Sequence, residues 1–193
     1  MAFEVELKAH VKDPLTLKHT LEHLSGISLA VCEEKDDTYY GWKGEEPLFR
    51  LRLERFGPSF SELSGEVRFT RKYKDNLEDG IEVNKEVEFM APADQAVNAH
   101  DFCLSLGYDV YIRKTKRGYS YQWMMDEEFF PLHIELVELI GLGWFLEMEF
   151  VLEQKEQVPD ARTRLLDVLA LLDIPQEQIE ERYYMHLLKA LSQ

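Results

Sequence analysis

The sequence predicts an α+β protein in which an antiparallel sheet curls around a charged cavity and helices cover its apolar outer face. Seven or eight segments alternate apolar and charged residues with the period of two that a β-strand imposes. Other segments have the apolar stripe of an amphipathic helix, which needs an apolar surface to pack against. The strand charges also sort by sign, with carboxylates on the first and last strands and basic residues on the middle ones.

Composition sets limits on domain number and partners. With 193 residues and 45% hydrophobic content, one globular domain spanning residues 1–193 is expected. The net charge of −15 argues against nucleic acid and anionic membranes as partners. Cys32 and Cys103 form no CxxC motif, and no apolar run is long enough for a signal peptide or a membrane span. A soluble, cytoplasmic protein is therefore expected.

The first predicted strand is Phe3–Val11, in which Glu4, Glu6 and Lys8 share one face and apolar residues share the other. A helix follows, with Asp13 as its N-cap and Pro14 in its first turn. This helix contains an HxxEH pattern that ends at His23 and could in principle meet a zinc ion. No later helix supplies a third ligand, so a solvated helix face is the better interpretation.

The middle of the chain contributes four predicted strands, most of whose charged residues are basic. The segments expected to be strands are Lys35–Trp42, Leu48–Leu53, Glu66–Lys74 and Asn84–Met90. Their charged faces hold Arg50 and Arg52, then Arg68, Thr70 and Lys72, then Glu86 and Glu88. Glycine, proline and polar clusters predict a loop before Glu66 and a turn over Asp75–Gly80.

The second half alternates helices and strands. Helices are expected from Pro92 to Gly107, over Asp160–Asp173 and from Pro175 to Leu191, and strands over Val110–Gln122, Leu132–Leu139 and Phe145–Phe150. Val110–Gln122 is either one strand or the two arms of a bend at Gly118. Its charged face holds Lys114 and Lys116, and the two later strands carry Glu135, Glu147 and Glu149.

Two architectures fit this alternation. A flat sheet could bury its apolar face and expose the charges to water. Alternatively, the sheet curls until its charged faces line a cavity, and the helices pack on the apolar outside. Sorting of the charges by strand favours the curled sheet, because surface ion pairing would not require it. In such a cavity, carboxylates would bind Mg²⁺ or Mn²⁺ and the basic residues would bind phosphate oxygens. This is the usual arrangement for phosphoryl or nucleotidyl transfer.

Glu4-x-Glu6-x-Lys8 resembles the ExExK signature of the CYTH family, the triphosphate tunnel metalloenzymes. The resemblance continues in Arg50-x-Arg52, Thr70-x-Lys72, Glu86-x-Glu88, Lys114-x-Lys116 and Leu142-Gly143-x-Phe145-x-Glu147-x-Glu149, and so covers nearly the whole chain. It implies an eight-stranded antiparallel β-tunnel, closed or nearly closed, with a charged lumen and helices outside.

The resemblance also implies roles for individual residues. The divalent metal, Mg²⁺ or Mn²⁺, is expected at Glu4, Glu6, Glu135, Glu147 and Glu149. The triphosphate is expected at Lys8, Arg50, Arg52, Lys72, Lys114 and Lys116, with Lys8 and Lys72 as the catalytic residues. Glu86, Glu88 and Thr70 are expected to line the lumen as well.

Two departures from the family pattern stand out. Many members carry Asp four residues before the first glycine of the GLG turn, where this chain has Val137. Glu135, two residues earlier on the same face, is a candidate replacement. Lys114-x-Lys116 replaces the usual K-x-R, so one bidentate guanidinium is missing.

The family contains two chemistries that use the same metal–triphosphate clamp. Class IV adenylyl cyclases convert ATP to cyclic AMP and pyrophosphate, and triphosphatases hydrolyse thiamine triphosphate, inorganic triphosphate or nucleotides. The whole-chain layout, including Arg182-Tyr183-Tyr184, resembles the cyclase branch, so a cyclase is the first hypothesis and a triphosphatase the second. A non-catalytic polyphosphate or nucleotide binder is the third. The partner would be a small triphosphate molecule, and by resemblance a homodimer is plausible.

Overall fold

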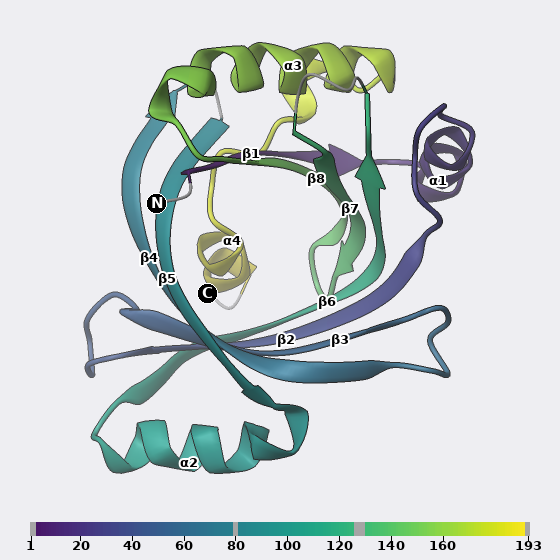
Figure 1. Ribbon diagram of the computed structural model, residues 1–193. Helices are drawn as coiled ribbons and strands as arrows, with labels where there is room; N and C mark the ends of the chain where they lie inside the picture. The colour runs from purple at the N-terminus through teal and green to yellow at the C-terminus, as the bar shows by residue number, and fades with distance from the viewer. Residues whose placement is uncertain (1–2, 79–80, 126–129, 192–193) are drawn as a thin grey trace.

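Eight antiparallel strands form a closed barrel in the computed structural model of the protein, which describes residues 3–78, 81–125 and 130–191 (Figure 1). The strands are β1 (Phe3–Val11), β2 (Val31–Gly41), β3 (Phe49–Gly57), β4 (Ser64–Glu78), β5 (Ile81–Pro92), β6 (Asp109–Trp123), β7 (Leu132–Leu139) and β8 (Gly143–Leu152). They pair in the order β1-β5-β4-β3-β2-β6-β7-β8, and β8 pairs with β1 to close the ring. The predicted eight-stranded tunnel is confirmed.

The helices are α1 (Pro14–Glu22), α2 (Ala96–Ser105), α3 (Val158–Leu171) and α4 (Tyr184–Leu191), with short 3₁₀ segments at Ala93–Gln95, Lys155–Gln157 and Gln176–Gln178. The Asp13 side chain accepts a hydrogen bond from the Thr16 backbone N–H at 3.1 Å and caps α1, as its sequence predicts.

The predicted charged side chains point into this barrel, and most of the apolar core packs on its outer face. The β1–β8 pairing sets Glu6 opposite Glu149 and Lys8 opposite Glu147, so the charged faces of the two strands coincide. Val5 and Leu7, on the other face of β1, are completely buried under the outer layer. A one-residue slip of register would exchange the two faces, so burial of the apolar face fixes the charged lumen.

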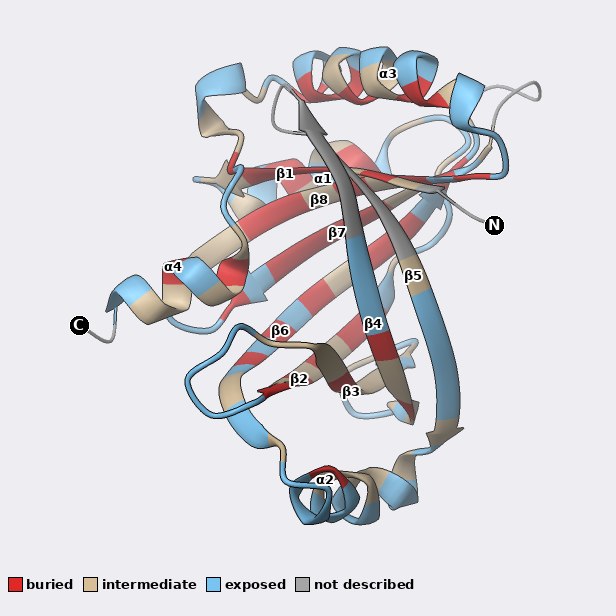
Figure 2. Cartoon of the chain, turned by 90° about the vertical axis from the view of Figure 1, so that its left-hand side faces the viewer, coloured by how far each residue is buried: buried red, intermediate tan, exposed pale blue. Residues whose placement is uncertain are grey.

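Helix α3 covers one side of the barrel. Its buried residues, which include Ala161, Leu165 and Leu169, recur with helical spacing and form one hydrophobic cluster with the outer faces of β1, β7 and β8. Figure 2 shows this buried face turned towards the strands and an exposed face turned to solvent. Burying each leucine side chain stabilises this layer by about 1.5–3 kcal/mol.

The other helices lie at different edges of the barrel. Helix α2 contributes Cys103 to a second cluster with Tyr40, Leu51 and Val67 on the outside of β2, β3 and β4. Helix α4 lies inside the ring in the view of Figure 1 and at one end of the strands in Figure 2. Its Tyr184 and Leu187 pack against β7 and β8 in a third cluster. Helix α4 therefore covers one mouth of the tunnel. None of the described helices is both long and apolar enough to cross a membrane.

Several predicted boundaries were wrong. Strand β2 begins at Val31, four residues before the predicted start, so Glu33 also joins it. The predicted turn over Asp75–Gly80 is mostly strand, because β4 runs to Glu78; residues 79–80 lie outside the described part. Strand β6 passes through Gly118 without a break, and a Cβ there would lie 2.2 Å from the Leu136 carbonyl oxygen. Glycine therefore lets β6 and β7 approach closely at this point.

The predicted last helix from Pro175 was also wrong in its start. Ile179 instead forms a β-bridge with Ala9, and the Glu180 backbone N–H donates to the Lys8 carbonyl at 2.9 Å. This pairing holds the segment extended along β1 until α4 begins at Tyr184.

Candidate functional site

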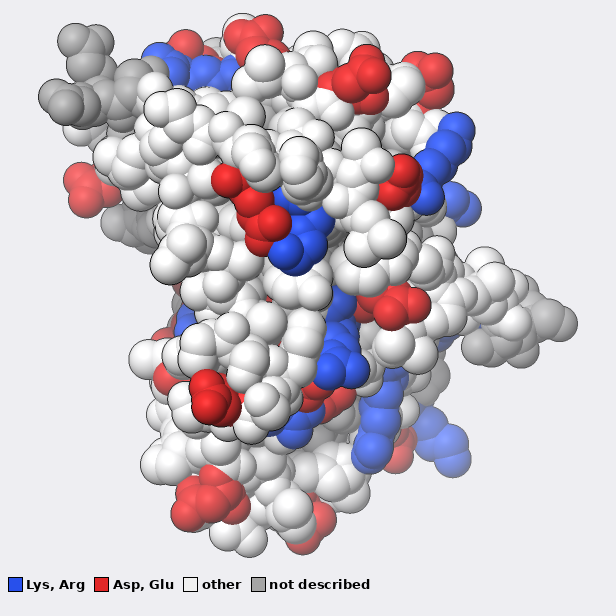
Figure 3. Space-filling view, turned by 90° about the vertical axis from the view of Figure 1, so that its right-hand side faces the viewer, with Lys and Arg blue, Asp and Glu red and all other residues white. Residues whose placement is uncertain are grey.

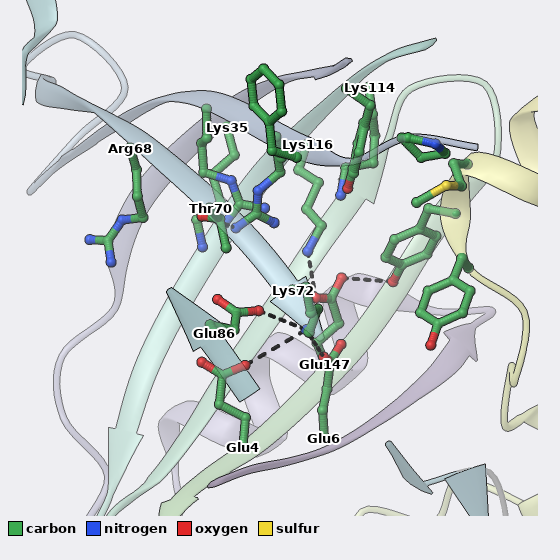
Figure 4. A pocket seen from close by; sticks show the side chains of 18 of the residues that line it. Glu4, Glu6, Lys35, Arg68, Thr70, Lys72, Glu86, Lys114, Lys116 and Glu147 are labelled. Carbon is green, nitrogen blue, oxygen red and sulfur yellow. Dashed lines mark hydrogen bonds and ion pairs between the residues drawn. The ribbon is translucent and has the colours of Figure 1, made fainter. Parts of the chain in front are cut away.

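The lumen contains a cavity of about 640 Å³. Every residue that the sequence assigned to the site lines it: Glu4, Glu6, Lys8, Arg50, Arg52, Thr70, Lys72, Glu86, Glu88, Lys114, Lys116, Glu135, Glu147 and Glu149. Figure 4 shows labelled carboxylates from β1, β5 and β8 below and labelled basic side chains from β2, β4 and β6 above. The structure thus brings the predicted residues together from seven of the eight strands, with β2 as the exception.

One region, here called the Lys72 group, consists of Lys72 and four carboxylates: Glu4, Glu6, Glu86 and Glu149. The Lys72 ammonium lies 3.0 Å from Glu86 and 3.7 Å from both Glu4 and Glu6 (Figure 4). Glu149 lies opposite Glu6 in the β1–β8 register. Four carboxylates around one ammonium give this region an excess of negative charge.

The excess charge shows in the pKa values of two carboxyl groups. Burial, followed by the repulsion of Glu86, raises the pKa of Glu4 to about 7. Burial and the nearby Glu4 and Glu6 raise the pKa of Glu149 well above its usual value, although Lys72 opposes them. Carboxyl groups that repel one another in this way would be stabilised in their charged form by an added cation.

The donor chemistry of the Lys72 group fits a hard divalent cation, because Mg²⁺ and Mn²⁺ prefer carboxylate oxygens. Among the described residues, no three acidic, histidine or cysteine side chains already have the spacing of a metal site. The fit therefore rests on the chemistry of the donors, and three of these carboxylates surround the Lys72 ammonium.

A second region, the Asp37 group, has the opposite composition. The Asp37 carboxylate accepts hydrogen bonds from Arg52 Nε at 2.6 Å and Arg52 Nη2 at 3.0 Å. Lys114 Nζ lies 2.8 Å from it, and Arg50 Nη1 lies 3.9 Å away. The Asp37 side chain is completely buried. Burial alone would raise its pKa, but Arg52, Lys114 and Arg50 hold the pKa of Asp37 well below its usual value.

The basic side chains of the Asp37 group, together with Lys8 and Lys116, are here called the basic region, and Tyr184 of α4 lies at its end. Its hydroxyl donates to Glu147 at 2.7 Å, and its ring lies 5.2–5.8 Å from the ammonium groups of Lys8, Lys114 and Lys116. Glu147 also accepts from Lys116 at 2.5 Å. Cation–π contacts and the Glu147 link therefore place three lysines around one aromatic ring.

A third region, the Lys35 group, consists of Lys35, Glu33, Glu54 and Glu135. The Lys35 ammonium lies 2.5 Å from Glu135, 3.1 Å from Glu33 and 3.3 Å from Glu54. Burial and the neighbouring Glu135 raise the pKa of Glu33 to about 7. Burial also acts to raise the pKa of Glu135. The neighbouring Lys116 and Lys35 nevertheless hold that pKa well below its usual value. Glu135, expected at the metal, is thus paired with lysines.

Sequence reasoning missed several of these residues. Lys35 and Asp37 lie inside the predicted strand, but Glu34 and Asp36 alternate with them, so both faces of this strand are charged and its sequence does not mark the lumen face. Glu54 extends the Arg50-x-Arg52 alternation by one step. Tyr184 entered the sequence analysis only through the Arg182-Tyr183-Tyr184 resemblance, because strand alternation cannot assign a residue of α4, the helix at the tunnel mouth, to the lumen.

The outside of the barrel differs from the lumen. On the face shown in Figure 3, basic side chains lie beside acidic ones. Ion pairs such as Arg117–Glu34 at 3.0 Å and Arg55–Asp36 at 2.5 Å are of this kind. The two histidines of the HxxEH pattern also lie outside, and their rings stack at 4.1 Å on α1. Charges of both signs mix on this face, whereas in the lumen they are sorted by region.

The sequence model of the CYTH domain matches residues 2–184. This chain belongs to the CYTH family. The family acts on small triphosphate substrates, depends on divalent cations, and includes enzymes of adenylyl cyclase and triphosphatase type. No curated protein sequence matches the chain.

Solved structures share the fold over nearly their whole length. The PH1819 protein from Pyrococcus horikoshii is 24% identical, with a TM-score of 0.71 and coverage of 97% of this chain and 99% of that one. A candidate adenylate cyclase from Vibrio parahaemolyticus is 19% identical, with a TM-score of 0.73 and coverage of 97% and 98%. A candidate adenylyl cyclase from Hippeastrum, described as having a dominant triphosphatase activity, is 14% identical, with a TM-score of 0.66 and coverage of 98% and 96%.

Proposed function

We propose that this protein is a divalent-cation-dependent enzyme that acts on an organic triphosphate, and that its reaction is the conversion of ATP to cyclic AMP and pyrophosphate. The observation that carries the proposal is the division of one cavity into a region with excess negative charge and a region with excess positive charge. A metal-bound triphosphate is complementary to both regions at once.

The basic residues hold the triphosphate. Arg50, Arg52 and Lys114 converge on Asp37, which fixes them in one place before a ligand arrives. Lys8 and Lys116 extend this surface towards α4. Side chains fixed in advance lose little entropy when phosphate oxygens bind, so the arrangement favours both binding and charge stabilisation during reaction.

The carboxylates of the Lys72 group would hold the cation, with Glu4, Glu6 and Glu149 as ligands and Glu86 beside them. A bound Mg²⁺ or Mn²⁺ supplies charge neutralisation at the phosphoryl oxygens. The Lys72 side chain is about one third exposed at 32%. With a cation held by the carboxylates, Lys72 would pair with a phosphate oxygen.

An organic group has a place at one end of the cavity. Tyr39, Leu48, Met185 and His186 line the cavity near α4, beside the basic residues. Apolar and aromatic side chains next to phosphate-binding cations suit a nucleoside or another aromatic group. In the cyclase reaction, a ribose hydroxyl oxygen bonds to the α-phosphorus. The bond from that phosphorus to the bridging oxygen breaks, and pyrophosphate leaves while the hydroxyl proton is released.

A triphosphatase is the second candidate. The partial exposure of Lys72 gives water a route to the Lys72 group, where a terminal phosphate could be attacked. The triphosphatase activity of the Hippeastrum protein also supports this candidate. Both reactions would use the same clamp and differ in whether a ribose hydroxyl or water is the nucleophile.

The test is a product assay. The protein is incubated with ATP, thiamine triphosphate or inorganic triphosphate, with Mg²⁺ or Mn²⁺, and the products are separated by chromatography. We expect cyclic AMP and pyrophosphate from ATP, and the Lys8→Ala variant controls for contaminating enzymes. Orthophosphate without cyclic AMP would contradict the cyclase and support the triphosphatase. Tight binding without any product would support the non-catalytic binder, and Val137→Asp would then be tested as a rescue.

A further inference from the structure

Two groups of carboxylates line the lumen, and each contains a lysine, but the two lysines sit differently. The Lys35 ammonium lies 2.5–3.3 Å from three carboxylates, and its side chain is only 4% exposed. The Lys72 ammonium lies 3.0 Å from Glu86 but 3.7 Å from Glu4 and Glu6, and its side chain is 32% exposed. Lys35 is therefore enclosed by its carboxylates, whereas Lys72 is loosely held.

The Lys35 ammonium has a carboxylate on each of three sides. It donates a hydrogen bond to Glu135, and Glu33 and Glu54 lie at ion-pair distance. Glu135 is also 3.3 Å from Lys116, so a second ammonium shares its charge. In the Lys72 group, one ammonium faces four carboxylates. The two groups thus differ in how much negative charge remains for a further cation.

A divalent cation in the Lys35 group would need the place that this ammonium occupies. Mg²⁺ binds carboxylate oxygens at about 2.0–2.1 Å, which requires the oxygens to converge on the ion rather than on the lysine. The next residue on the same face of β7 is Val137, which is completely buried and offers no oxygen ligand. The Lys35 group therefore has neither a vacant centre nor an additional donor at that position of β7.

We infer that the Lys35 ammonium is a built-in substitute for a metal ion in its carboxylate group, and that the tunnel binds one divalent cation, at the Lys72 group. The inference rests on the proposed function because it takes the Lys72 group as the metal site. It adds that Glu135 is a partner of lysines in this chain and not a metal ligand. Removing the charge of Lys35 would open a second cation site.

The test counts bound Mn²⁺. Mn²⁺ alone is titrated into the wild type, Lys35→Gln and Lys35→Arg, and the free ion is measured by electron paramagnetic resonance. We expect one tightly bound ion per chain in the wild type and in Lys35→Arg, which keeps the charge. We expect two in Lys35→Gln, together with the spectral broadening of two neighbouring Mn²⁺ ions. The double variant Lys35→Gln/Glu149→Gln should bind one, because only the new site remains intact.

The outcomes separate this inference from the proposed function. Two ions in the wild type, or one in folded Lys35→Gln, would overturn the role of Lys35 and leave the metal site of the proposed function standing. No bound ion in the wild type would overturn that metal site and this inference together. If Lys35→Gln does not fold in metal-free buffer, recovery of its circular dichroism spectrum on adding Mn²⁺ supports the inference. Failure to recover overturns it.

Discussion

The Lys72 group and the Asp37 group are opposite in composition. In the first, one ammonium lies among four carboxylates, with a contact of 3.0 Å to Glu86. In the second, one carboxylate lies among three basic side chains, with contacts of 2.6 Å to Arg52 and 2.8 Å to Lys114. Each central residue thus neutralises only part of the charge around it.

This difference shows how a tunnel can hold many charges and still fold. A fully unpaired buried charge is very costly, and a fully neutralised group would have no attraction left for a ligand. Each region instead keeps one fixed counter-ion and a surplus of a single sign. The surplus of the first region suits a metal cation and that of the second suits phosphate. The fully buried Asp37 therefore matters mainly for folding, and the side chains that face the ligand, Lys72 among them, matter for activity.

The largest expected effect on stability is at the centre of the basic region. Asp37→Ala leaves Arg52, Lys114 and Arg50 repelling one another without their buried partner, so we expect it to lower the free energy of unfolding by about 3–5 kcal/mol. Chemical denaturation measures this loss. Asp36→Ala is the matched control, because Asp36 is the next residue but its side chain is 40% exposed, and its loss should be below about 1 kcal/mol. Equal losses would contradict the comparison.

Substitution of lumen residues that face the ligand, such as Lys8 and Glu6, should instead affect activity. Lys8→Ala and Glu6→Ala each remove one fixed charge that faces the substrate or the cation, and we expect each to lower kcat about 10²–10³-fold. Both proteins should stay folded by circular dichroism. Lys12→Ala, an exposed lysine just beyond β1, should keep wild-type kcat. An unfolded product from either variant would show that the residue is structural and would defeat the division of roles.

Weakening the acidic surplus should change the metal requirement. Glu149→Gln removes one carboxylate charge from the Lys72 group, so we expect the Mg²⁺ or Mn²⁺ concentration for half-maximal activity to rise about 10–100-fold. A metal titration of the steady-state rate measures this shift. Glu153→Gln, at an exposed position just beyond the end of the same strand, should leave the titration unchanged. A loss of rate with no change in metal requirement would place Glu149 outside the metal site.

The smallest expected effect is at the end of the tunnel covered by α4. Tyr184→Phe removes the hydroxyl that donates to Glu147, but Lys116 still pairs with that carboxylate, so we expect a loss of stability of about 1.5 kcal/mol. Tyr111→Phe removes an exposed hydroxyl that donates to Glu46 at 2.9 Å, and we expect its loss of stability to be smaller. Thermal unfolding compares the two. A larger loss in Tyr111→Phe would mean that α4 is not held through Glu147.

Much of the lumen can be predicted because its signal is local. Alternation over a few residues decides which side chains share a strand face, and this alone groups Glu4 with Glu6 and Arg50 with Arg52 in the cavity wall. The lumen positions of Lys35 and Asp37 escape the same reasoning. Glu34 and Asp36 alternate with them on the opposite face, so both faces of the strand are charged, and the pairing of β2 with β3 and β6 decides which face lines the lumen.

By itself, the sequence determined the alternation that makes the strands, the charge on each lumen face and the family. The tertiary structure decided which charge neutralises which. Lys35 meets Glu135 across 100 positions of the chain, and Asp37 joins basic residues of two other strands. These pairs depend on barrel closure and register, because coulombic attraction weakens with distance and is screened by water unless the partners are buried together. The ammonium of Lys35 within one carboxylate group and the surplus negative charge of the Lys72 group therefore arise only in the folded barrel.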